Sequence, residues 1–324
     1  MLLEVKNLKN YFYTEDGIVP AMDGLSFNLE SGETLAIVGE SGCGKSVTAL
    51  SILRIFQSPP GKIVDGQIIY RERDLLTLPE KEMQTIRGND ISMIFQEPLT
   101  SLNPVFTISR QICDPLIRHQ GKTKKEAAAE AVKLLQKVGI PEAERVINDY
   151  PHQFSGGMRQ RIMIAMALAC NPSILIADEP TTALDVTIQA QILELLCDIK
   201  ERTNTSIILI THDLGVVAQM AEKVLVMYAG EAVEYADVES IFEHPNHPYT
   251  HGLLHSVPVM GVRRDKLYNI KGTIPSASEY CAGCRFAPRC DQADERCFAT
   301  PAPIIYTGIN DYYVRCWKYA KESN

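Results

Sequence analysis

Short apolar runs separated by helical segments recur along the first 235 residues of the chain. Alternating apolar and polar positions at residues 2–5 and 21–29 predict half-buried strands. Mostly apolar runs occupy residues 34–38, 66–70, 91–95, 174–178 and 206–211, followed by a hairpin-like stretch at 224–234. Helical periodicity appears at residues 45–53, 108–119, 124–138, 155–169, 185–203 and 214–221. Apolar strands that alternate with helices predict an α/β core around a mainly parallel sheet.

The segment between the strand at residues 34–38 and the next helix reads Gly-Glu-Ser-Gly-Cys-Gly-Lys-Ser and fits G-x-x-x-x-G-K-[ST]. Its glycines let successive N–H groups converge on one anion, and the helix N-terminus adds partial positive charge. We expect Lys45 to reach the β- and γ-phosphates of a nucleotide and the Ser46 hydroxyl to hold Mg²⁺. A chance glycine-rich turn is the alternative, but the strand-loop-helix context favours a phosphate site. The expected binding residues are Gly39, Ser41, Gly42, Cys43, Gly44, Lys45, Ser46 and Val47.

Polar side chains follow three other predicted strands. Gln96 is a candidate magnesium ligand, as is Asp178, and the adjacent Glu179 is placed to polarise an attacking water. His212 follows the strand at residues 206–211 and is a candidate contact of the γ-phosphate. Taken singly, each has an ordinary structural explanation, because strand-end histidines usually hydrogen-bond locally and an Asp-Glu pair often lies in a solvated loop. Only the phosphate loop upstream favours the catalytic interpretation.

Two further features suit a nucleotide. Ser155 is placed to cap a helix that begins with Gly156 and Gly157, which makes a second anion site without an obvious ligand in its own chain. Phe12 and Tyr13 precede an Asp-Gly turn, and a ring there can stack on adenine, although such rings are as often part of a core.

Composition excludes several classes of protein. A formal charge of -8 with no block of lysine or arginine argues against nucleic-acid binding. The start of the chain lacks the basic-then-apolar layout of an export signal, and no apolar run approaches about 18 residues. We therefore expect a cytoplasmic protein that does not span a membrane.

Five of the nine cysteines fall between Cys281 and Cys316. In a cytosolic chain such clustering indicates a metal site before a disulfide framework. The segment contains prolines and few large apolar groups, so thiolate ligation would supply order. Zinc accepts four thiolates as readily as an iron-sulfur cluster does, and free thiols are a third possibility. The C-x-x-C spacing by itself favours the pair Cys281 and Cys284 as ligands.

Over residues 1–235, six motifs in a fixed order resemble the ATPase subunit of ATP-binding-cassette (ABC) transporters. They are the Walker A loop at residues 39–46, the Q-loop Gln96, the signature Ser155-Gly156-Gly157, the Walker B pair Asp178 and Glu179, the D-loop Asp185 and the switch His212. Phe12 or Tyr13 matches the adenine-stacking position. The commonest signature is Leu-Ser-Gly-Gly-Gln, whereas Phe154 and Met158 flank the core here.

The resemblance implies an α/β fold, a P-loop NTPase core of the RecA-like type with an antiparallel β subdomain. A helical subdomain would be inserted at about residues 97–165 of a nucleotide-binding domain spanning 1–235. In this family two ATPase subunits sandwich two ATP molecules, each phosphate loop facing the signature of the other subunit. Glu179 would be the hydrolytic base and Lys45 would stabilise the transferring phosphoryl group, with Gln96 and His212 assisting.

The remaining residues, 236–324, would form a small metal-binding C-terminal extension. His247-Pro-Tyr-Thr250 and the run Gly283-Cys-Arg-Phe-Ala-Pro-Arg-Cys290 resemble the importer branch for dipeptides, oligopeptides and nickel. That resemblance implies a 4Fe-4S cluster, with zinc as the alternative metal and Cys281 as the alternative ligand. The implied cluster ligands are Cys284, Cys290, Cys297 and Cys316.

The branch also implies partners: two membrane permease subunits, a second ATPase subunit in a hetero- or homodimer, and indirectly an extracytoplasmic peptide-binding protein. The chain would lie peripherally on the cytoplasmic face of the membrane. Three other functions remain open, namely import of nickel or another small solute, a soluble cassette ATPase acting on DNA or ribosomes, and a metal-dependent redox protein. The compact insert and the single motif set argue against the soluble ATPase, and no flavin or haem motif supports the redox protein.

Overall fold

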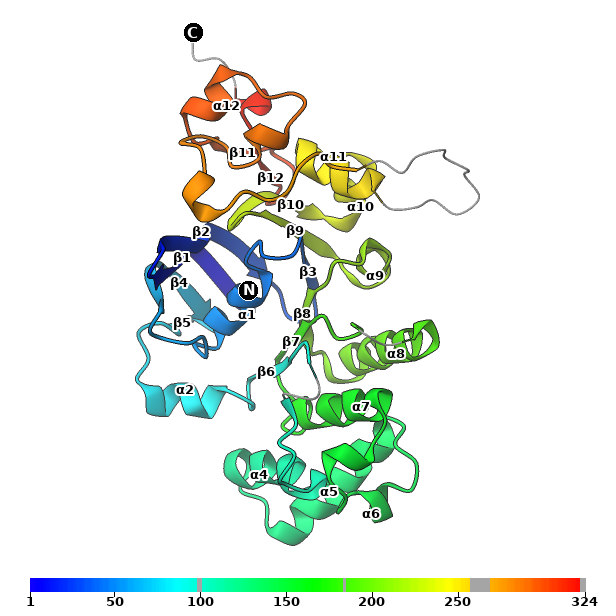
Figure 1. Ribbon diagram of the computed structural model, residues 1–324. Helices are drawn as coiled ribbons and strands as arrows, with labels where there is room; N and C mark the ends of the chain where they lie inside the picture. The colour runs from blue at the N-terminus through cyan, green and yellow to red at the C-terminus, as the bar shows by residue number, and fades with distance from the viewer. Residues whose placement is uncertain (98–100, 183–184, 257–268, 321–324) are drawn as a thin grey trace. The chain divides into compact units, whose positions relative to one another are not determined.

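The computed structural model describes residues 1–97, 101–182, 185–256 and 269–320, which form two compact units (Figure 1). The first unit contains residues 1–29, 34–76 and 211–324, and the second contains residues 30–33 and 77–210. Among the described residues, no helix is both long and apolar enough to cross a membrane.

An antiparallel sheet of four strands, in the order β2-β1-β4-β5, belongs to the first unit. Its strands are β1 (Leu3–Thr14), β2 (Gly17–Leu29), β4 (Gly61–Tyr70) and β5 (Arg73–Asp74). β1 and β2 form a hairpin closed by the predicted Asp-Gly turn. β1 extends well beyond the four residues that the alternating pattern predicted, so the aromatic residues at its end lie within the strand. The expected antiparallel β element is therefore present.

A second set of strands in the first unit carries the phosphate loop. In the order β11-β12-β10-β9-β3, the parallel pair is β3 with β9, and the others pair antiparallel. The strands are β3 (Thr34–Val38), β9 (Lys223–Tyr228), β10 (Glu231–Asp237), β11 (Ile304–Tyr306) and β12 (Tyr313–Arg315). The helices of this unit are α1 (Lys45–Ile52), α9 (Leu214–Met220), α10 (Val238–Glu243), α11 (Pro248–His255) and α12 (Glu295–Ala299). Short 3₁₀ turns lie at Ala277–Glu279, Ala287–Arg289 and Trp317–Tyr319.

The C-terminal extension is part of this strand set. β12 pairs with β10, with Tyr313 opposite Tyr235. Buried aromatic rings then connect the two: Phe286 lies 5.1 Å from Tyr228 and 5.4 Å from Tyr249, measured between ring centroids. The extension therefore shares one hydrophobic core with the strands that hold the phosphate loop.

The second unit contains three parallel strands in the order β8-β7-β6. They are β6 (Ile91–Ile94), β7 (Ile174–Asp178) and β8 (Ser206–Ile210), and every residue in them is buried. Such fully buried strands are typical of a sheet covered on both faces. Its helices are α2 (Glu80–Ile86), α4 (Ile108–Gln120), α5 (Lys124–Lys137), α6 (Ala143–Val146), α7 (Gly156–Ala167) and α8 (Val186–Thr203), with a 3₁₀ turn at Pro151–Gln153.

Helices α4 to α7 lie between β6 and β7 in the sequence and pack against one another (Figure 1). α5 begins at a capping box, in which the Thr123 side chain accepts from the Glu126 N–H and the Glu126 carboxylate accepts from the Thr123 N–H. α4 begins at a Thr107 cap and ends at Gly121, which adopts a left-handed conformation. The helices expected at residues 108–119 and 124–138 are confirmed.

Candidate functional site

The phosphate loop curves between β3 and α1, and glycine is required at its turning points. Gly39 and Gly44 have φ values of 155° and 102°. A Cβ on Gly39 would lie 2.2 Å from the carbonyl oxygen of Met227, and one on Gly44 would lie 2.3 Å from that of Ala21. Any side chain at either position would collide with backbone, so the loop keeps this shape only with glycine there.

Lys45 is the first residue of α1, and its ammonium group is folded back into the loop. Nζ donates to the carbonyl oxygens of Gly39 at 2.8 Å and Glu40 at 3.1 Å, and Lys45 is only 7% exposed. A buried cation held by neutral carbonyls is well placed to gain from an anionic ligand. Ser46 follows in the first turn of α1 and is partly exposed, as are Gly44 and Val47, while Ser41 and Gly42 are exposed.

Cys43 fills the interior of the loop. It is fully buried, and burial raises the pKa of its thiol. A buried, protonated thiol is a poor nucleophile. We therefore expect Cys43 in the folded protein to react with iodoacetamide at least ~100-fold more slowly than a free cysteine, measured by peptide mass spectrometry, and at the normal rate after denaturation. Labelling of the native protein at the rate of free cysteine would show that the loop opens.

In the second unit, Gln96 and Glu179 lie together, as neighbouring parallel strands predict. The amide Nε2 of Gln96 donates to Glu179 Oε2 at 3.0 Å, and the Thr182 hydroxyl donates to the same oxygen at 2.8 Å. Glu179 has φ 46°, in the left-handed region that non-glycine residues rarely adopt. Such strain concentrates at functional sites. Asp178 beside it is 4% exposed.

The signature segment presents an open helix start. Ser155 caps α7, its Oγ accepting from the Met158 N–H at 3.4 Å, and both Ser155 and Gly156 are exposed. A Cβ on Gly156 would meet no atom within 4 Å, whereas one on Gly157 would lie 3.2 Å from Ile188. Gly156 therefore leaves the helix start accessible, and Gly157 lets α7 approach α8.

A side chain that the sequence did not single out connects α7 to the segment that follows β7. Gln160 is 3% exposed, and its Nε2 donates to the carbonyl oxygen of Pro180 at 2.5 Å, one residue after Glu179. Arg159 and Arg161 donate to the carbonyl oxygens of Pro151 and Val138, respectively. All three side chains therefore bond the surrounding backbone.

The remaining predicted site residues have clear local positions. Asp185 caps α8, with Oδ1 accepting from the Ile188 N–H at 3.0 Å. In the first unit, His212 is exposed just before α9. Tyr13, near the end of β1, is 48% exposed, and Phe12 is partly buried, with its ring 3.1 Å from the position of a Cβ on Gly61.

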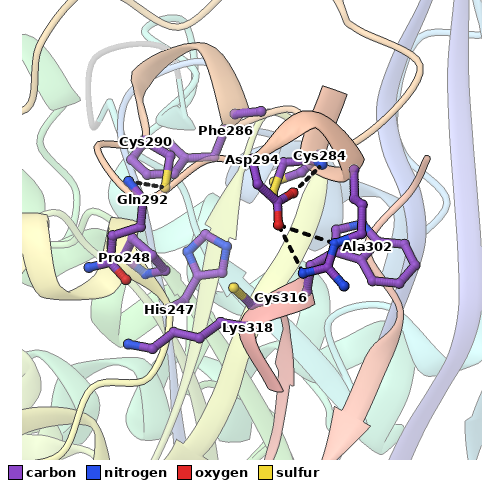
Figure 2. Close-up of a pocket in the computed structure, with 14 residues that line it drawn as sticks. His247, Pro248, Cys284, Phe286, Cys290, Gln292, Asp294, Ala302, Cys316 and Lys318 are labelled. Atoms are coloured by element: carbon purple, nitrogen blue, oxygen red, sulfur yellow. Dashed lines mark hydrogen bonds and ion pairs between the residues drawn. The ribbon is translucent and has the colours of Figure 1, made fainter. Parts of the chain in front are cut away.

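Four of the clustered cysteines line one cavity of about 320 Å³ in the first unit (Figure 2). They are Cys284, Cys290, Cys297 and Cys316. Cys281 is not among the lining residues, and its Sγ donates to the carbonyl oxygen of Cys284 at 3.0 Å. Figure 2 shows the labelled sulfur atoms together with His247, whose pKa is lowered to about 3 by burial. Burial also raises the pKa of Cys284 to about 12, so this thiol is protonated without a metal.

Within the described part of the chain, no three His, Cys, Asp or Glu side chains are grouped closely enough to hold a single metal ion. The four cysteines thus line one cavity, but their sulfur atoms do not converge on a single position. A mononuclear zinc site requires sulfur ligands at about 2.3 Å from one ion. Among the described residues, this arrangement is therefore not a preformed site for any single metal ion, zinc or iron.

Comparisons with known proteins identify the family of the chain. Residues 22–182 match the ABC transporter family, and residues 233–297 match the C-terminal region of oligopeptide/dipeptide transporters. The oligopeptide transport ATP-binding protein AppD of Bacillus subtilis (strain 168) is 55% identical, over 99% of this chain and 98% of AppD. The dipeptide transport ATP-binding protein DppD of the same organism is 52% identical, over 98% of this chain and 94% of DppD.

Among solved structures, the dimeric ATP-binding cassette MJ0796 bound to ADP and Pi matches with a TM-score of 0.66 and 29% identity. The match covers 73% of this chain and 99% of that one. The P-loop ATPase fold expected from the sequence is thereby confirmed. The chain belongs to the ABC transporter family, as an ATPase subunit whose C-terminal region is of the oligopeptide/dipeptide type.

Proposed function

We propose that this chain is the ATP-hydrolysing subunit of an importer of di- or oligopeptides. The observation that carries the proposal is the presence, in one chain, of the phosphate loop, the Gln96–Glu179 pair and a C-terminal region of the oligopeptide/dipeptide type. Relatives over nearly the full length are named for oligopeptide and dipeptide transport, which favours peptides over nickel or another small solute. The same relatives favour transport over a soluble cassette ATPase.

In the proposed mechanism, the loop N–H groups and Lys45 bind the β- and γ-phosphates. Glu179 accepts a proton from the attacking water, and the Gln96 amide orients that carboxylate from 3.0 Å. His212 contacts the γ-phosphate, and Phe12 or Tyr13 stacks on the adenine. The oxygen donors of Ser46, Gln96 and Asp178 suit Mg²⁺, which prefers oxygen ligands. When bound, Mg²⁺ neutralises charge on the phosphate oxygens.

The exposed start of α7 supports a site shared between two subunits. Ser155 and Gly156 would bind the triphosphate held by the phosphate loop of a second ATPase subunit. Asp185 caps α8, the helix that α7 approaches through Gly157. Whether that subunit is a second copy or a related chain decides the outcome of a mixing experiment.

We expect Ser155→Arg to keep ATP binding but lose hydrolysis, because the added side chain fills the open helix start and the residues of the phosphate loop are unchanged. If the pair is a homodimer, mixing Ser155→Arg with Lys45→Ala should give mixed dimers with up to half of the wild-type activity. In each mixed dimer one of the two ATP sites is intact, because it combines Lys45 of one copy with Ser155 of the other. A heterodimer predicts recovery only when the related chain is added. Full activity of Ser155→Arg by itself would contradict the shared site.

The four cavity-lining cysteines are the proposed ligands of a 4Fe-4S cluster. Four cysteines that line one cavity suit a cluster with several iron atoms, whereas zinc remains the competing metal. Binding would deprotonate the thiols, which burial otherwise keeps neutral. No catalytic step is assigned to this group.

Anaerobically purified protein is expected to contain iron and acid-labile sulfide and to absorb visible light. Cys316→Ala should reduce the iron content severalfold. Cys281→Ala is the matched control, because its thiol does not line the cavity, and it should retain the iron. Stoichiometric zinc without sulfide, or loss of iron in Cys281→Ala alone, would refute the proposed ligand set.

The proposed partners are two membrane permease subunits, a second ATPase subunit and, indirectly, an extracytoplasmic peptide-binding protein. The chain would act peripherally on the cytoplasmic face of the membrane. The test is copurification with membrane subunits, followed by ATPase assays of the complex with its binding protein. Stimulation by di- and tripeptides but not by Ni²⁺ is expected, and the reverse pattern would favour the nickel importer.

A further inference from the structure

Arg289 lies between two of the cavity-lining cysteines and reaches the phosphate loop. Its guanidinium binds both carboxylate oxygens of Glu40, the second residue of the loop. Nη1 donates to Oε2 at 2.6 Å, and Nη2 donates to Oε1 at 3.1 Å. The Arg289 side chain is only 5% exposed, and its Nε donates to the carbonyl oxygen of Lys271 at 2.8 Å. The contact is thus a bidentate ion pair on a fixed guanidinium, the strongest geometry available to these groups.

Tyr249 holds the same loop residue by its backbone. The Glu40 N–H donates to the Tyr249 hydroxyl at 2.9 Å, and Tyr249 is fully buried. Its ring packs edge-on against Tyr228 at 4.7 Å and lies 5.4 Å from Phe286. The hydroxyl therefore has a fixed position. The N–H and the side chain of Glu40 are bonded to residues of the C-terminal region that lie 209 and 249 positions away in the sequence, respectively.

The third polar group of Glu40 faces inward. Its carbonyl oxygen accepts from Lys45 Nζ at 3.1 Å. Glu40 therefore bonds both to Arg289 and Tyr249 and to Lys45, the lysine that is assigned to the phosphates. A loop whose conformation is set before the ligand arrives loses less entropy on binding.

We infer that Arg289 and Tyr249 are positioning residues for ATP binding, which hold the phosphate loop in its binding conformation through Glu40. The inference rests on the proposed assignment of Lys45 and its loop to the phosphates. It makes the C-terminal extension, including the segment between Cys284 and Cys290, part of the structure on which nucleotide affinity depends.

Arg289→Ala is expected to raise the Kd and KM for Mg-ATP about tenfold, equivalent to about 1.4 kcal/mol, with kcat changed by less than about twofold. That split follows because the contact supports ground-state and transition-state binding equally. Arg289→Lys keeps the charge but loses the bidentate guanidinium contact, so its affinity for Mg-ATP should lie between those of Arg289→Ala and wild type. The readouts are equilibrium binding of Mg-ATP and steady-state ATPase kinetics of the full chain with its transporter partners.

Lys271→Ala is the matched control. Its ammonium pairs with Asp291 at 3.0 Å, with both side chains well exposed, and alanine preserves the carbonyl oxygen that accepts from Arg289. Such surface pairs contribute little, so the Kd for Mg-ATP should stay within about twofold of wild type. A tenfold rise in Lys271→Ala equal to that in Arg289→Ala would overturn the inference.

Glu40→Gln tests the other partner without removing a buried side chain, and it decides the question if Arg289→Ala fails to fold. It should raise KM by a similar factor. Because both changes break one contact, the double variant should bind Mg-ATP no more weakly than the worse single variant. Additive losses, or normal KM in Glu40→Gln, would overturn the inference. If Lys45→Ala kept normal binding, the loop assignment itself would be wrong, which is a different result.

Discussion

Replacing Glu179 by glutamine is expected to slow ATP hydrolysis at least about a hundredfold while leaving ATP binding intact, since positioned general bases contribute about 10²–10⁴ in rate. Glutamine has nearly the shape of glutamate but cannot accept the proton of the attacking water. In the structure the carboxylate is fixed by its left-handed backbone and by the Gln96 and Thr182 donors. An amide at this position retains an oxygen acceptor for those donors, so the loss should fall on the chemical step.

Single-turnover hydrolysis and equilibrium Mg-ATP binding separate the two effects. Glu201→Gln, the same change at an exposed position of α8, is the matched control and should hydrolyse ATP at the wild-type rate. Wild-type turnover by Glu179→Gln would exclude Glu179 as the base. A large loss of binding would instead indicate a structural role for the carboxylate.

Replacing Lys45 by alanine is expected to weaken Mg-ATP binding at least about a hundredfold, equivalent to about 2.7 kcal/mol. The ammonium group is the buried cation of the phosphate loop, and its two carbonyl contacts become orphaned when it is removed. Alanine therefore deletes the favourable charge and loosens the loop around Gly39. Both effects act on the bound triphosphate.

Equilibrium binding of Mg-ATP measures the loss, with circular dichroism to confirm that the variant folds. Lys62→Ala removes a lysine from an exposed position of β4 and is the matched control, with affinity expected within about twofold of wild type. Unchanged affinity in Lys45→Ala would mean that ATP does not bind at this loop.

The elements that could be predicted are those with local signals. The phosphate loop combines a residue pattern with a strand before it and a helix after it, so both its position and its glycine geometry follow from adjacent residues. Gln96 and Glu179 could be singled out because each follows a predicted strand, but their contact depends on β6 and β7 being neighbours in the sheet, which adjacent residues do not indicate. The helix α5 could be predicted for the same reason as the phosphate loop, since its helical periodicity lies within the segment itself.

The contacts that were missed join residues far apart in the sequence. Nothing near Glu40 indicates that Arg289 binds it, and nothing near Gln160 indicates its bond to the Pro180 carbonyl. The pairing of β12 with β10 likewise has no local pattern. The cysteines show the same limit: C-x-x-C spacing favours Cys281, whereas the fold returns Cys316 to the cavity after β12. The four cysteines that line the cavity are those that the family resemblance implies as ligands.

Uptake of a labelled dipeptide into vesicles is the decisive test of ATP-driven peptide import by this chain. The vesicles would contain the membrane subunits and both ATPase subunits, with the extracytoplasmic binding protein on the opposite side from ATP. The dipeptide should accumulate only when ATP is present with the ATPase subunits, and it should not accumulate when this chain carries Glu179→Gln. Uptake without ATP, or equal uptake with Glu179→Gln, would contradict ATP-driven import by this chain.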